Sequence, residues 1–426
     1  MYRLWMLSAL IAARGGRTAV LGFVRHAPRH HPHCQPPQPP VGSSPGRLVA
    51  STAVKIPSSV QSALAEMDGV HEVIDVRSPK EFAEDHIPGA INLPVLSDDQ
   101  RHEVGVLYKA DAFEAKKTGA SMVARNIAEH VSGHFKAKEG GYMPLVYCWR
   151  GGSRSGSMAV VLAQIGWRVK LLDGGYKAYR KEVIAARDAL PQTFDLRVVA
   201  GLTGVGKTAL LHHLRECGEQ VIDLEGLANH RGSTLGAADL PPQPTQKHFE
   251  SLLVEEMRRF DASKPVFVEA ESSKVGDLQV PGSLFGAMKG APRIAVTLPV
   301  AVRVQRILDD YEYWVRNPAE LKAVLQRLKK AHGQAVLDEW CALIDGGEWE
   351  ALVERLLVEH YDVTYSHQAS RHRAPSTSVH LEDFSEGQLR AFVDAATSKA
   401  IKVGAAPTKS SSSSDKGRGC GCCSDR

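Results

Sequence analysis

The feature that most constrains the fold of this chain is a glycine-rich segment at residues 201–208. It reads Gly-Leu-Thr-Gly-Val-Gly-Lys-Thr and fits the pattern G-x-x-x-x-G-K-[ST]. A short apolar run at residues 196–200 precedes it, and a helical pattern at residues 209–216 follows it. A strand, a phosphate-binding turn and a helix in this order are typical of parallel sheets, so the sequence predicts an α/β fold.

Each residue type in this motif suits phosphate binding. Gly201, Gly204 and Gly206 let backbone N–H groups approach phosphate oxygens closely. Lys207 neutralises charge on those oxygens, and Thr208 offers a hydroxyl to Mg²⁺. We expect these five residues to bind a nucleotide or another diphosphate, and Mg²⁺ could accompany either ligand.

Carboxylates and arginines further along the chain could complete such a site. Asp223 follows the next predicted strand, and Glu269 and Glu271 end a later one, so each could hold Mg²⁺ or simply be a solvated carboxylate. Arg303 and Arg306 are three residues apart on a predicted helix and could clamp phosphates from one face, although surface arginine pairs are common.

Composition limits the classes of protein that the chain can belong to. Its 426 residues suffice for two domains, and 43% apolar with 23% charged residues is a globular composition. The sequence contains no uninterrupted apolar run of eighteen residues, which is about the length that a membrane span needs. Seven scattered cysteines do not suggest a disulfide framework, and a net charge of +4 means that nucleic-acid contacts would come from local basic patches.

A second chemical motif surrounds Cys148, at the end of a predicted strand. Residues 147–155 read Tyr-Cys-Trp-Arg-Gly-Gly-Ser-Arg-Ser, a glycine-rich turn that leads into a helix. Backbone N–H groups of such a turn, together with Arg150 and Arg154, favour a thiolate and bind a negative group attached to it. The spacing Cys-x5-Arg is shared with cysteine-dependent phosphatases, so the motif alone does not separate a sulfur or selenium carrier from a phosphatase.

The flanks of this loop separate the two interpretations. Residues 75–77 (DVR), 86–92 (HIPGAIN) and 172–175 (LDGG) resemble the signatures of rhodanese domains. The loop is one residue longer than in many single rhodanese domains, which puts simple thiosulfate sulfurtransferase activity in doubt.

Longer strings resemble one family. Residues 75–109, residues 147–158 (YCWRGGSRSGSM) and residues 223–232 (DLEGLANHRG), with the phosphate loop, resemble the tRNA 2-selenouridine synthase family from about residue 75 to 365. The resemblance implies a rhodanese-like parallel-sheet domain, then a P-loop NTPase-like α/β domain with a helical C-terminal extension.

The resemblance also implies an activity. Sulfur in the wobble 2-thiouridine of tRNA would be replaced by selenium from selenophosphate, through an S-geranylated intermediate made from geranyl diphosphate. The catalytic cysteine of the family falls on Cys148. A diphosphate suits the phosphate loop as well as a nucleotide does, so the loop could either grip geranyl diphosphate or use ATP. The implied partners are tRNA and an enzyme that supplies selenophosphate. The alternatives are a rhodanese-type sulfurtransferase or cysteine phosphatase fused to a P-loop NTPase, and a non-catalytic rhodanese-like binding module.

We expect five segments along the chain. Residues 1–56 have arginines but no acidic residue, which predicts a mitochondrial or chloroplast transit peptide, or else a disordered leader on a cytoplasmic protein. The others are a rhodanese-like domain, a P-loop domain, a helical region and a disordered Ser/Cys-rich tail. Their bounds are 57–190, 191–300, 301–405 and 406–426.

One helical cluster of basic residues could contact tRNA. It comprises Lys322, Arg327, Lys329, Lys330 and His332. The plainer interpretation is a solvated helix face. No cluster of cysteines and histidines predicts a metal site in the body of the chain.

Overall fold

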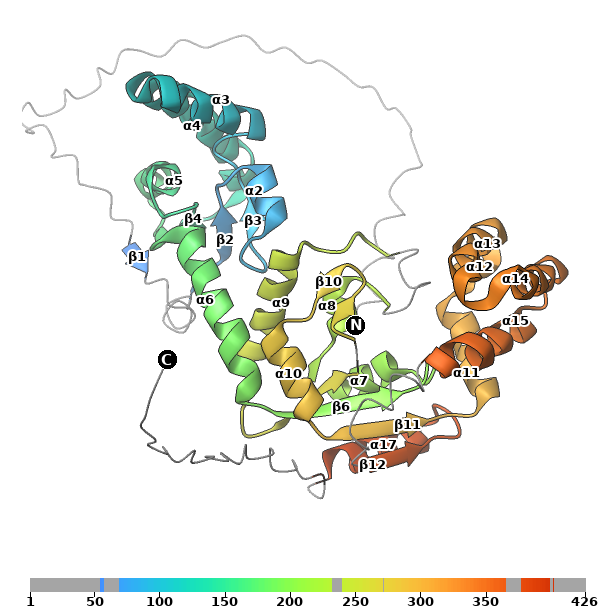
Figure 1. Cartoon of the computed structure of the whole chain (residues 1–426). Helices are drawn as coiled ribbons and strands as arrows, with labels where there is room; N and C mark the ends of the chain where they lie inside the picture. The colour runs from blue at the N-terminus through green and yellow to red at the C-terminus, as the bar shows by residue number, and fades with distance from the viewer. Residues whose placement is uncertain are drawn as a thin grey trace, which may run out of the picture. The chain divides into compact units, whose positions relative to one another are not determined.

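The structure is a computed structural model that describes residues 54–56, 69–231, 240–270, 272–364, 377–398 and 401. Of the expected leader at residues 1–56, residues 54–56 form a strand of the first sheet. Residues 1–53, Glu271 and the Ser/Cys-rich tail lie outside the described residues. Within the described part, two parallel sheets carry helices on connections between their strands, as the sequence predicted (Figure 1).

The first sheet has the strand order β1-β5-β4-β2-β3, with every pair parallel. Its strands are β1 (Val54–Ile56), β2 (Glu72–Asp75), β3 (Ile91–Asn92), β4 (Pro144–Tyr147) and β5 (Lys170–Leu172). The central strand β4 is buried along its whole length, which explains its uninterrupted apolar sequence. Its carboxyl end delivers Cys148.

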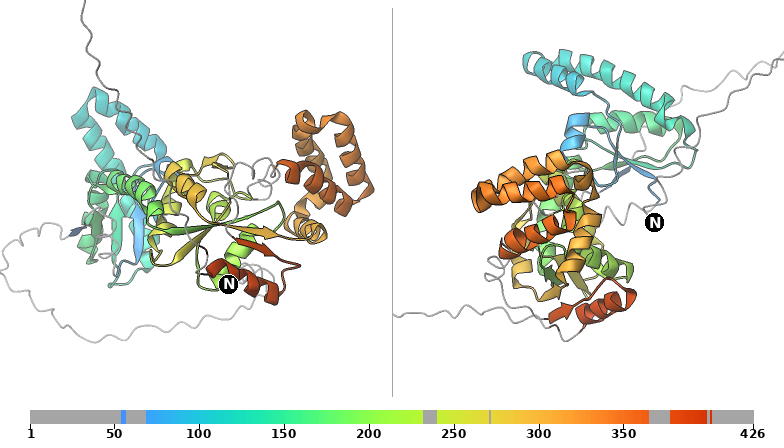
Figure 2. Two further views of the ribbon diagram at one scale, coloured as in Figure 1. Left: turned by 60° about the horizontal axis from the view of Figure 1, so that its bottom comes forward. Right: turned by 90° about the vertical axis from the view of Figure 1, so that its right-hand side faces the viewer.

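Five helices connect or follow these strands. They are α2 (Pro79–Glu84), α3 (Asp98–Ala110), α4 (Ala112–Ser132), α5 (Ser153–Ile165) and α6 (Gly175–Ala189). Figures 1 and 2 show α3 and α4 side by side, and the two helices pack together. Asp111 ends α3 and caps α4, because its carboxylate accepts the N–H groups of Phe113 and Glu114 at 2.9 and 3.0 Å.

The second sheet has the order β12-β11-β6-β8-β7, and its pairs are also parallel. Its strands are β6 (Asp195–Gly201), β7 (Gln220–Ile222), β8 (Pro265–Glu269), β11 (Arg293–Thr297) and β12 (Thr377–His380). The sequence analysis did not predict β12, which comes from a region of mostly helical pattern. It pairs with β11, and α17 (Glu386–Thr397) packs against it (Figure 1).

Helices surround this sheet and extend from it. Those between its strands are α7 (Lys207–Glu216), α8 (Leu224–Ala228), α9 (Gln246–Arg258) and α10 (Gly282–Gly290). After β11 come α11 (Val300–Asp310), α12 (Glu312–Arg316), α13 (Pro318–Leu325), α14 (Lys329–Gly346) and α15 (Trp349–Arg355). These last helices bury a core of their own around Trp314 and Trp340.

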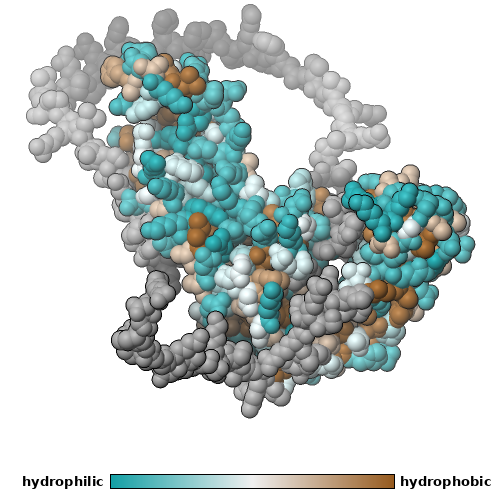
Figure 3. Space-filling view, in the orientation of Figure 1, coloured by the Kyte–Doolittle hydropathy of each residue, from teal (hydrophilic) through white to brown (hydrophobic). Residues whose placement is uncertain are grey.

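Surface character and helix length bear on the environment of the chain. Most of the described surface in Figure 3 is hydrophilic, and hydrophobic side chains gather near α11 and α15. None of the described helices combines the length and the apolar character that a membrane span requires.

A buried arginine ties the phosphate loop to the helical region. Arg303 on α11 is 2% exposed, and its Nε donates to the carbonyl oxygen of Thr203 at 2.8 Å. Its Nη1 and Nη2 donate to the carboxylate of Asp362 at 3.0 and 2.6 Å. The guanidinium of Arg303 therefore joins the phosphate loop at Thr203 to the segment at Asp362, which lies 59 residues after Arg303 in the chain.

We expect Arg303→Ala to lower the free energy of unfolding by about 1.5–3 kcal/mol, because it removes charge-assisted hydrogen bonds between the buried guanidinium and the partly exposed carboxylate of Asp362. Denaturant unfolding followed by tryptophan fluorescence measures the change. The control is Arg316→Ala, which removes an ion pair to Glu312 whose side chains are 69% and 66% exposed. It should cost less than about 1 kcal/mol. Equal losses in the two variants would contradict the structural role of Arg303.

Candidate functional site

The first candidate site is the loop between β4 and α5. Cys148 directly follows β4 and is 4% exposed, and the Oγ of Ser155 lies 3.2 Å from its Sγ. Backbone N–H groups of Arg150, Gly152 and Ser155 also hydrogen-bond the thiol sulfur. The sulfur thus sits at the N-terminal end of a helix among donors, as the sequence predicted for a thiolate cradle.

Glycines allow the loop to close this tightly. Gly175, at the start of α6, has φ +56°, and a Cβ there would collide with the carbonyl oxygen of Cys148. Gly151 has φ +66°, and its Cβ would lie 2.8 Å from the carbonyl oxygen of Leu172. The backbone of the LDGG string therefore packs directly against the backbone of the cysteine loop, and a side chain at Gly151 or Gly175 would prevent this contact.

The donors around the sulfur change its acidity. Burial by itself raises the pKa of the Cys148 thiol, but hydrogen bonds from the Ser155 hydroxyl and from backbone N–H groups outweigh burial and lower the pKa below its ordinary value. A larger fraction of Cys148 is therefore a thiolate near neutral pH than for a solvent-exposed cysteine.

The two arginines of the loop differ in their surroundings. Arg154 on α5 donates to Glu81 of α2, with Nη1 2.7 Å and Nη2 3.3 Å from the carboxylate oxygens. Burial raises the pKa of Glu81, and the contacts with Arg154 outweigh this and lower it. Arg154 thus braces the loop against α2, whereas Arg150 is exposed.

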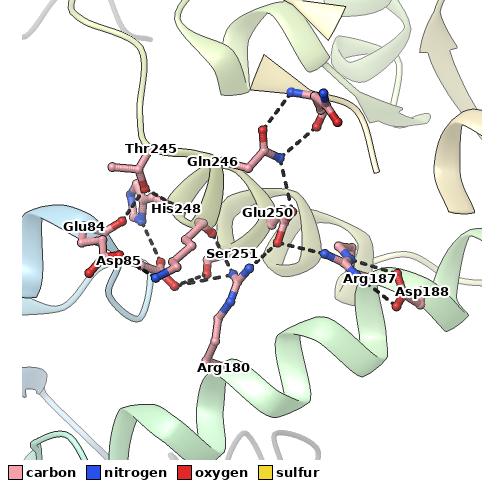
Figure 4. Close-up of polar contacts among 12 residues, drawn as sticks. Glu84, Asp85, Arg180, Arg187, Asp188, Thr245, Gln246, His248, Glu250 and Ser251 are labelled. Atoms are coloured by element: carbon pink, nitrogen blue, oxygen red, sulfur yellow. Dashed lines mark hydrogen bonds and ion pairs between the residues drawn. The ribbon is translucent and has the colours of Figure 1, made fainter. Parts of the chain in front are cut away.

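A buried carboxylate connects this loop with the P-loop part of the chain (Figure 4). Tyr176 donates its backbone N–H to the carbonyl oxygen of Cys148 at 2.8 Å, and its hydroxyl donates to Asp85 at 2.8 Å. Asp85 is also contacted from α9 by Ser251 at 3.1 Å and by His248 at 3.3 Å. Burial raises the pKa of Asp85, but these hydrogen bonds hold it below its ordinary value.

Arginines on α6 extend the same network. Arg180 lies 3.6 Å from Asp85 and also pairs with Glu250 on α9. Arg187 pairs with Glu250 at 3.1 Å (Figure 4). Charges from the two parts of the chain therefore neutralise each other at the point where α6 packs on α9.

The second candidate site is the phosphate loop between β6 and α7. Gly204 and Gly206 have φ +83° and +73°, conformations that only glycine adopts without strain. Lys207 begins α7, and its Nζ donates to the carbonyl oxygen of Gly201 at 3.3 Å. Thr208 donates its hydroxyl to Glu225 at 2.8 Å. The structure thus brings together all five residues that the sequence predicted to bind phosphate.

The predicted acidic residues lie beside this loop in different roles. Asp223 caps α8 by accepting the Gly226 N–H at 2.7 Å, and it also contacts His212 at 2.7 Å. Glu269 is fully buried and accepts the Glu225 N–H at 2.9 Å. The carboxylate that touches Thr208 is that of Glu225, which the sequence analysis did not single out.

A cavity of about 390 Å³ opens directly from the phosphate loop. Gly206, Lys207 and Thr208 line one part of it, together with Glu225, Arg231 and Arg306. Large apolar residues of α11, α12, α13, α15 and the π-helix that follows α15 (Leu356–Tyr361) line the remainder. They include Ile307, Trp314, Leu321, Leu352, Leu356 and Leu357.

Two arginines at this cavity have unused hydrogen-bond donors. Among the described residues, the buried Arg231 Nη1 and Arg306 Nε have no hydrogen-bond partner. The Arg231 guanidinium lies over the ring of Tyr311 at 5.3 Å, and that of Arg306 lies over Phe384 at 4.5 Å. Aromatic faces hold both cations beside the loop with donors to spare, as an anion site requires.

Comparisons with known proteins identify both parts of the chain. A family model described as the Rhodanese-like domain matches residues 59–182, and one described as the tRNA 2-selenouridine synthase AAA domain matches residues 194–336. A tRNA 2-selenouridine synthase of Hydrogenovibrio crunogenus is 34% identical over 327 residues, which cover 70% of this chain and 89% of that protein. The chain belongs to the tRNA 2-selenouridine synthase family.

Other relatives agree with this membership. The tRNA 2-selenouridine synthase of Nitrosomonas europaea is 37% identical over 251 residues, which cover 56% of this chain and 63% of that protein. Among solved structures, the N-terminal domain of a protein from Clostridium difficile 630 is 36% identical and covers 31% of this chain and 99% of that one, with a TM-score of 0.27. The two family models and the relative from Hydrogenovibrio crunogenus confirm the resemblance read from the sequence.

Within this member of the tRNA 2-selenouridine synthase family, sequence reasoning missed Glu225 and Arg231. Both lie in the string DLEGLANHRG, which carries the family resemblance but does not by itself indicate a role for either residue. Of the predicted arginine pair, Arg306 lines the cavity, whereas Arg303 is committed to Asp362. Only Arg306 of that pair is therefore placed to clamp a phosphate.

The basic cluster predicted to contact tRNA lies on the helical region. Lys322 pairs with Asp345 at 2.5 Å, which reduces its availability. Arg327, Lys329 and Lys330 are exposed at the start of α14 and just before it. His332 instead contacts His360 at 2.9 Å.

We expect Cys148 to be alkylated by iodoacetamide with a pH midpoint below that of an ordinary cysteine, because the thiolate is the reacting form. Ser155→Ala should raise this midpoint by about one pH unit or more, since it removes a hydrogen bond to a charged group. Mass spectrometry of the Cys148 peptide measures the rate, and Cys148→Ser gives the background from other cysteines. An unchanged midpoint would show that Ser155 does not stabilise the thiolate.

Proposed function

We propose that this chain replaces sulfur by selenium in the wobble 2-thiouridine of tRNA, in two steps at two sites. Geranyl diphosphate would bind at the phosphate loop and alkylate the sulfur, and selenium from selenophosphate would then displace the geranylated sulfur with the help of Cys148. The observation that carries this proposal is the apolar cavity that continues from the phosphate loop.

The character of the cavity favours an isoprenoid diphosphate over a nucleotide. A nucleotide needs polar groups placed to bind its ribose and base, whereas the far part of this cavity is lined by Trp314, Leu352 and Leu356. An isoprenoid chain has only apolar surface to bury, and each CH₂ group buried contributes about 0.8 kcal/mol. A ligand with a diphosphate head and an apolar tail matches both ends of the cavity.

The cations at the loop suit the first step. The thiocarbonyl sulfur of 2-thiouridine attacks C1 of geranyl diphosphate, the C1–O bond breaks, and diphosphate leaves with the electron pair while the uracil ring loses its N3 proton. Charge builds on the leaving diphosphate, where Lys207, Arg231 and Arg306 can stabilise it. Their positions beside the loop support a role for this site in diphosphate departure.

Mg²⁺ fits the same place. Magnesium binds through one or two carboxylates together with the phosphates of its substrate, and retains several waters. The Thr208 hydroxyl and the Glu225 carboxylate, 2.8 Å apart, are oxygen ligands of this kind. The carboxylate of Glu269 accepts the backbone N–H of Glu225 and so helps to orient that residue. Among the described residues, no group of three or more metal-binding side chains forms a dedicated cage. When bound, Mg²⁺ would add positive charge to the diphosphate.

The oxidation state of selenium in the donor determines which reaction Cys148 can carry out in the second step. Selenium in selenophosphate already has the oxidation level of selenide, so forming an S–Se bond on Cys148 would need an oxidant. Attack of the thiolate on phosphorus needs none: an S–P bond forms, the P–Se bond breaks, and hydrogen selenide leaves. Water then hydrolyses the S–P bond to phosphate and the free thiolate. The donors that surround Cys148 Sγ suit a tetrahedral anion attached to sulfur.

Selenide completes the exchange. It attacks C2 of the geranylated base, geranylthiolate leaves, and the proton on selenium passes to N3 of the ring. Alkylation in the first step matters here because it converts the sulfur into a good leaving group. The exposed Arg327, Lys329 and Lys330, with Lys322, are the residues that we propose to contact the tRNA backbone.

Nucleoside analysis tests the proposal as a whole. tRNA from cells that lack the protein should contain no selenium-modified or geranyl-modified wobble uridine, and expression of the wild-type chain should restore both. A sulfurtransferase fused to a P-loop NTPase would leave these nucleosides unchanged, and that result would refute the proposal.

We expect Cys148→Ser to abolish selenium incorporation into geranylated tRNA while tRNA binding persists, because a serine hydroxyl is a far weaker nucleophile than a thiolate. Selenouridine formation is measured by mass spectrometry of digested tRNA. Cys217→Ser, at an exposed cysteine, is the matched control and should retain full activity. Undiminished selenation by Cys148→Ser would remove this residue from the mechanism.

We expect Lys207→Ala to weaken binding of geranyl diphosphate about tenfold to hundredfold, because it removes a charge-assisted contact with phosphate. Selenation of tRNA that is already geranylated should be nearly unaffected, since Cys148 has its own cradle. The mutant is assayed once for each step, with Lys289→Ala on α10 as the control for loss of a lysine. Equal failure of both steps in a folded Lys207→Ala protein would mean that the phosphate loop serves both reactions.

A further inference from the structure

One wall of the cavity at the phosphate loop is shared with a second hollow. Leu308, Val315 and Trp349 line both spaces, so their side chains lie where the two spaces meet, and we call these three side chains the partition. The second hollow has a charged rim, to which Asp309, Glu312 and Glu350 contribute. A ligand in the inner cavity is therefore separated from this outer space by three apolar side chains.

Of the three residues, Trp349 belongs to the part of the cavity that the helical core forms. At the near end, Ile307 packs against the loop, because a Cβ on Gly204 would lie 2.9 Å from the Cδ1 of Ile307. Trp349 instead packs on the separate helical core around Trp314, Leu321 and Leu352. The cavity thus runs from the phosphate loop into the helical core, and Trp349 stands where it meets the outer hollow.

We propose that Trp349 closes the far end of this cavity and so limits the length of the isoprenoid chain that the protein accepts. This inference rests on the proposed use of an isoprenoid diphosphate and adds a specificity-determining residue to it. The ten-carbon geranyl chain ends inside the partition. The fifteen-carbon farnesyl chain carries one more isoprene unit, which meets the Trp349 indole.

Size and location make Trp349 the member of the partition that matters most. It has the largest side chain of the three, and it stands at the first turn of α15, where truncation leaves the backbone of the helix in place. Removal of the indole joins the inner cavity to the outer hollow. The additional isoprene unit gains a path, although its tip then lies near the charged rim.

The test compares two ligands on the full chain. Dissociation constants are measured for geranyl diphosphate and farnesyl diphosphate, with inorganic diphosphate as a probe of the head-group site alone. We expect the wild-type protein to bind geranyl diphosphate at least tenfold more tightly than farnesyl diphosphate. In Trp349→Ala this preference should fall by tenfold or more, whereas the affinity for inorganic diphosphate should be unchanged because the loop is untouched.

Two further variants make the result specific. Glu350→Ala is the matched control, since Glu350 lines only the outer hollow and its loss does not open the partition. Leu308→Ala opens the same partition from α11 and should shift the preference in the same direction, which keeps the test valid if Trp349→Ala does not fold. Geranyl and farnesyl transfer to 2-thiouridine tRNA should follow the same order as the affinities.

The outcomes separate this inference from the proposed function. If the wild-type protein binds inorganic diphosphate but shows no added affinity for geranyl diphosphate, the proposed use of the cavity is wrong. If it prefers geranyl diphosphate and both Trp349→Ala and Leu308→Ala keep that preference unchanged, the proposed function stands and the role of the partition is overturned.

Discussion

Backbone N–H groups at the start of a helix have no partner within that helix, and both candidate sites are built on this constraint. In the first sheet, β4 leads through a glycine-rich turn into α5, and the free donors converge on the sulfur of Cys148. In the second sheet, β6 leads through residues 201–206 into α7, where the donors are available to phosphate oxygens. The same local geometry thus stabilises a thiolate of the chain itself in one place and suits a bound anion in the other.

The buried carboxylate of Asp85 links these two regions. It receives a hydrogen bond from Tyr176 beside the cysteine loop. Figure 4 shows its contacts with Ser251 and His248 on α9. A buried carboxylate without such partners would cost several kcal/mol, so the network holds α6 and α9 in one arrangement. Because α9 packs on α8, which carries Glu225 to Thr208, the contacts extend without interruption to the phosphate loop.

Chemistry at the phosphate loop depends on what surrounds it more than on the loop itself. The loop and Lys207 would bind any diphosphate, and the apolar lining from α11 to α15 favours an isoprenoid tail. In the proposed reaction the arginines would add charge beside a leaving diphosphate, and their guanidinium groups lie over aromatic rings. Under the proposed function, the helical region would select the ligand and the loop at the edge of the sheet would bind its phosphates.

The sequence by itself determined the α/β class, the strand before each glycine-rich turn, Cys148 and the five residues of the phosphate loop, because these features depend on neighbours within a few positions along the chain. It did not reveal β12, whose four residues become a strand only by pairing with β11. It also left open which arginine faces a ligand: Arg303 and Arg306 are equivalent in spacing, and only the packed structure commits Arg303 to Asp362 and turns Arg306 toward the cavity. The cavity itself is formed by residues up to 158 positions apart, from Thr203 to Tyr361. Its shape follows from long-range packing of helices, and local sequence patterns carry no information about such contacts.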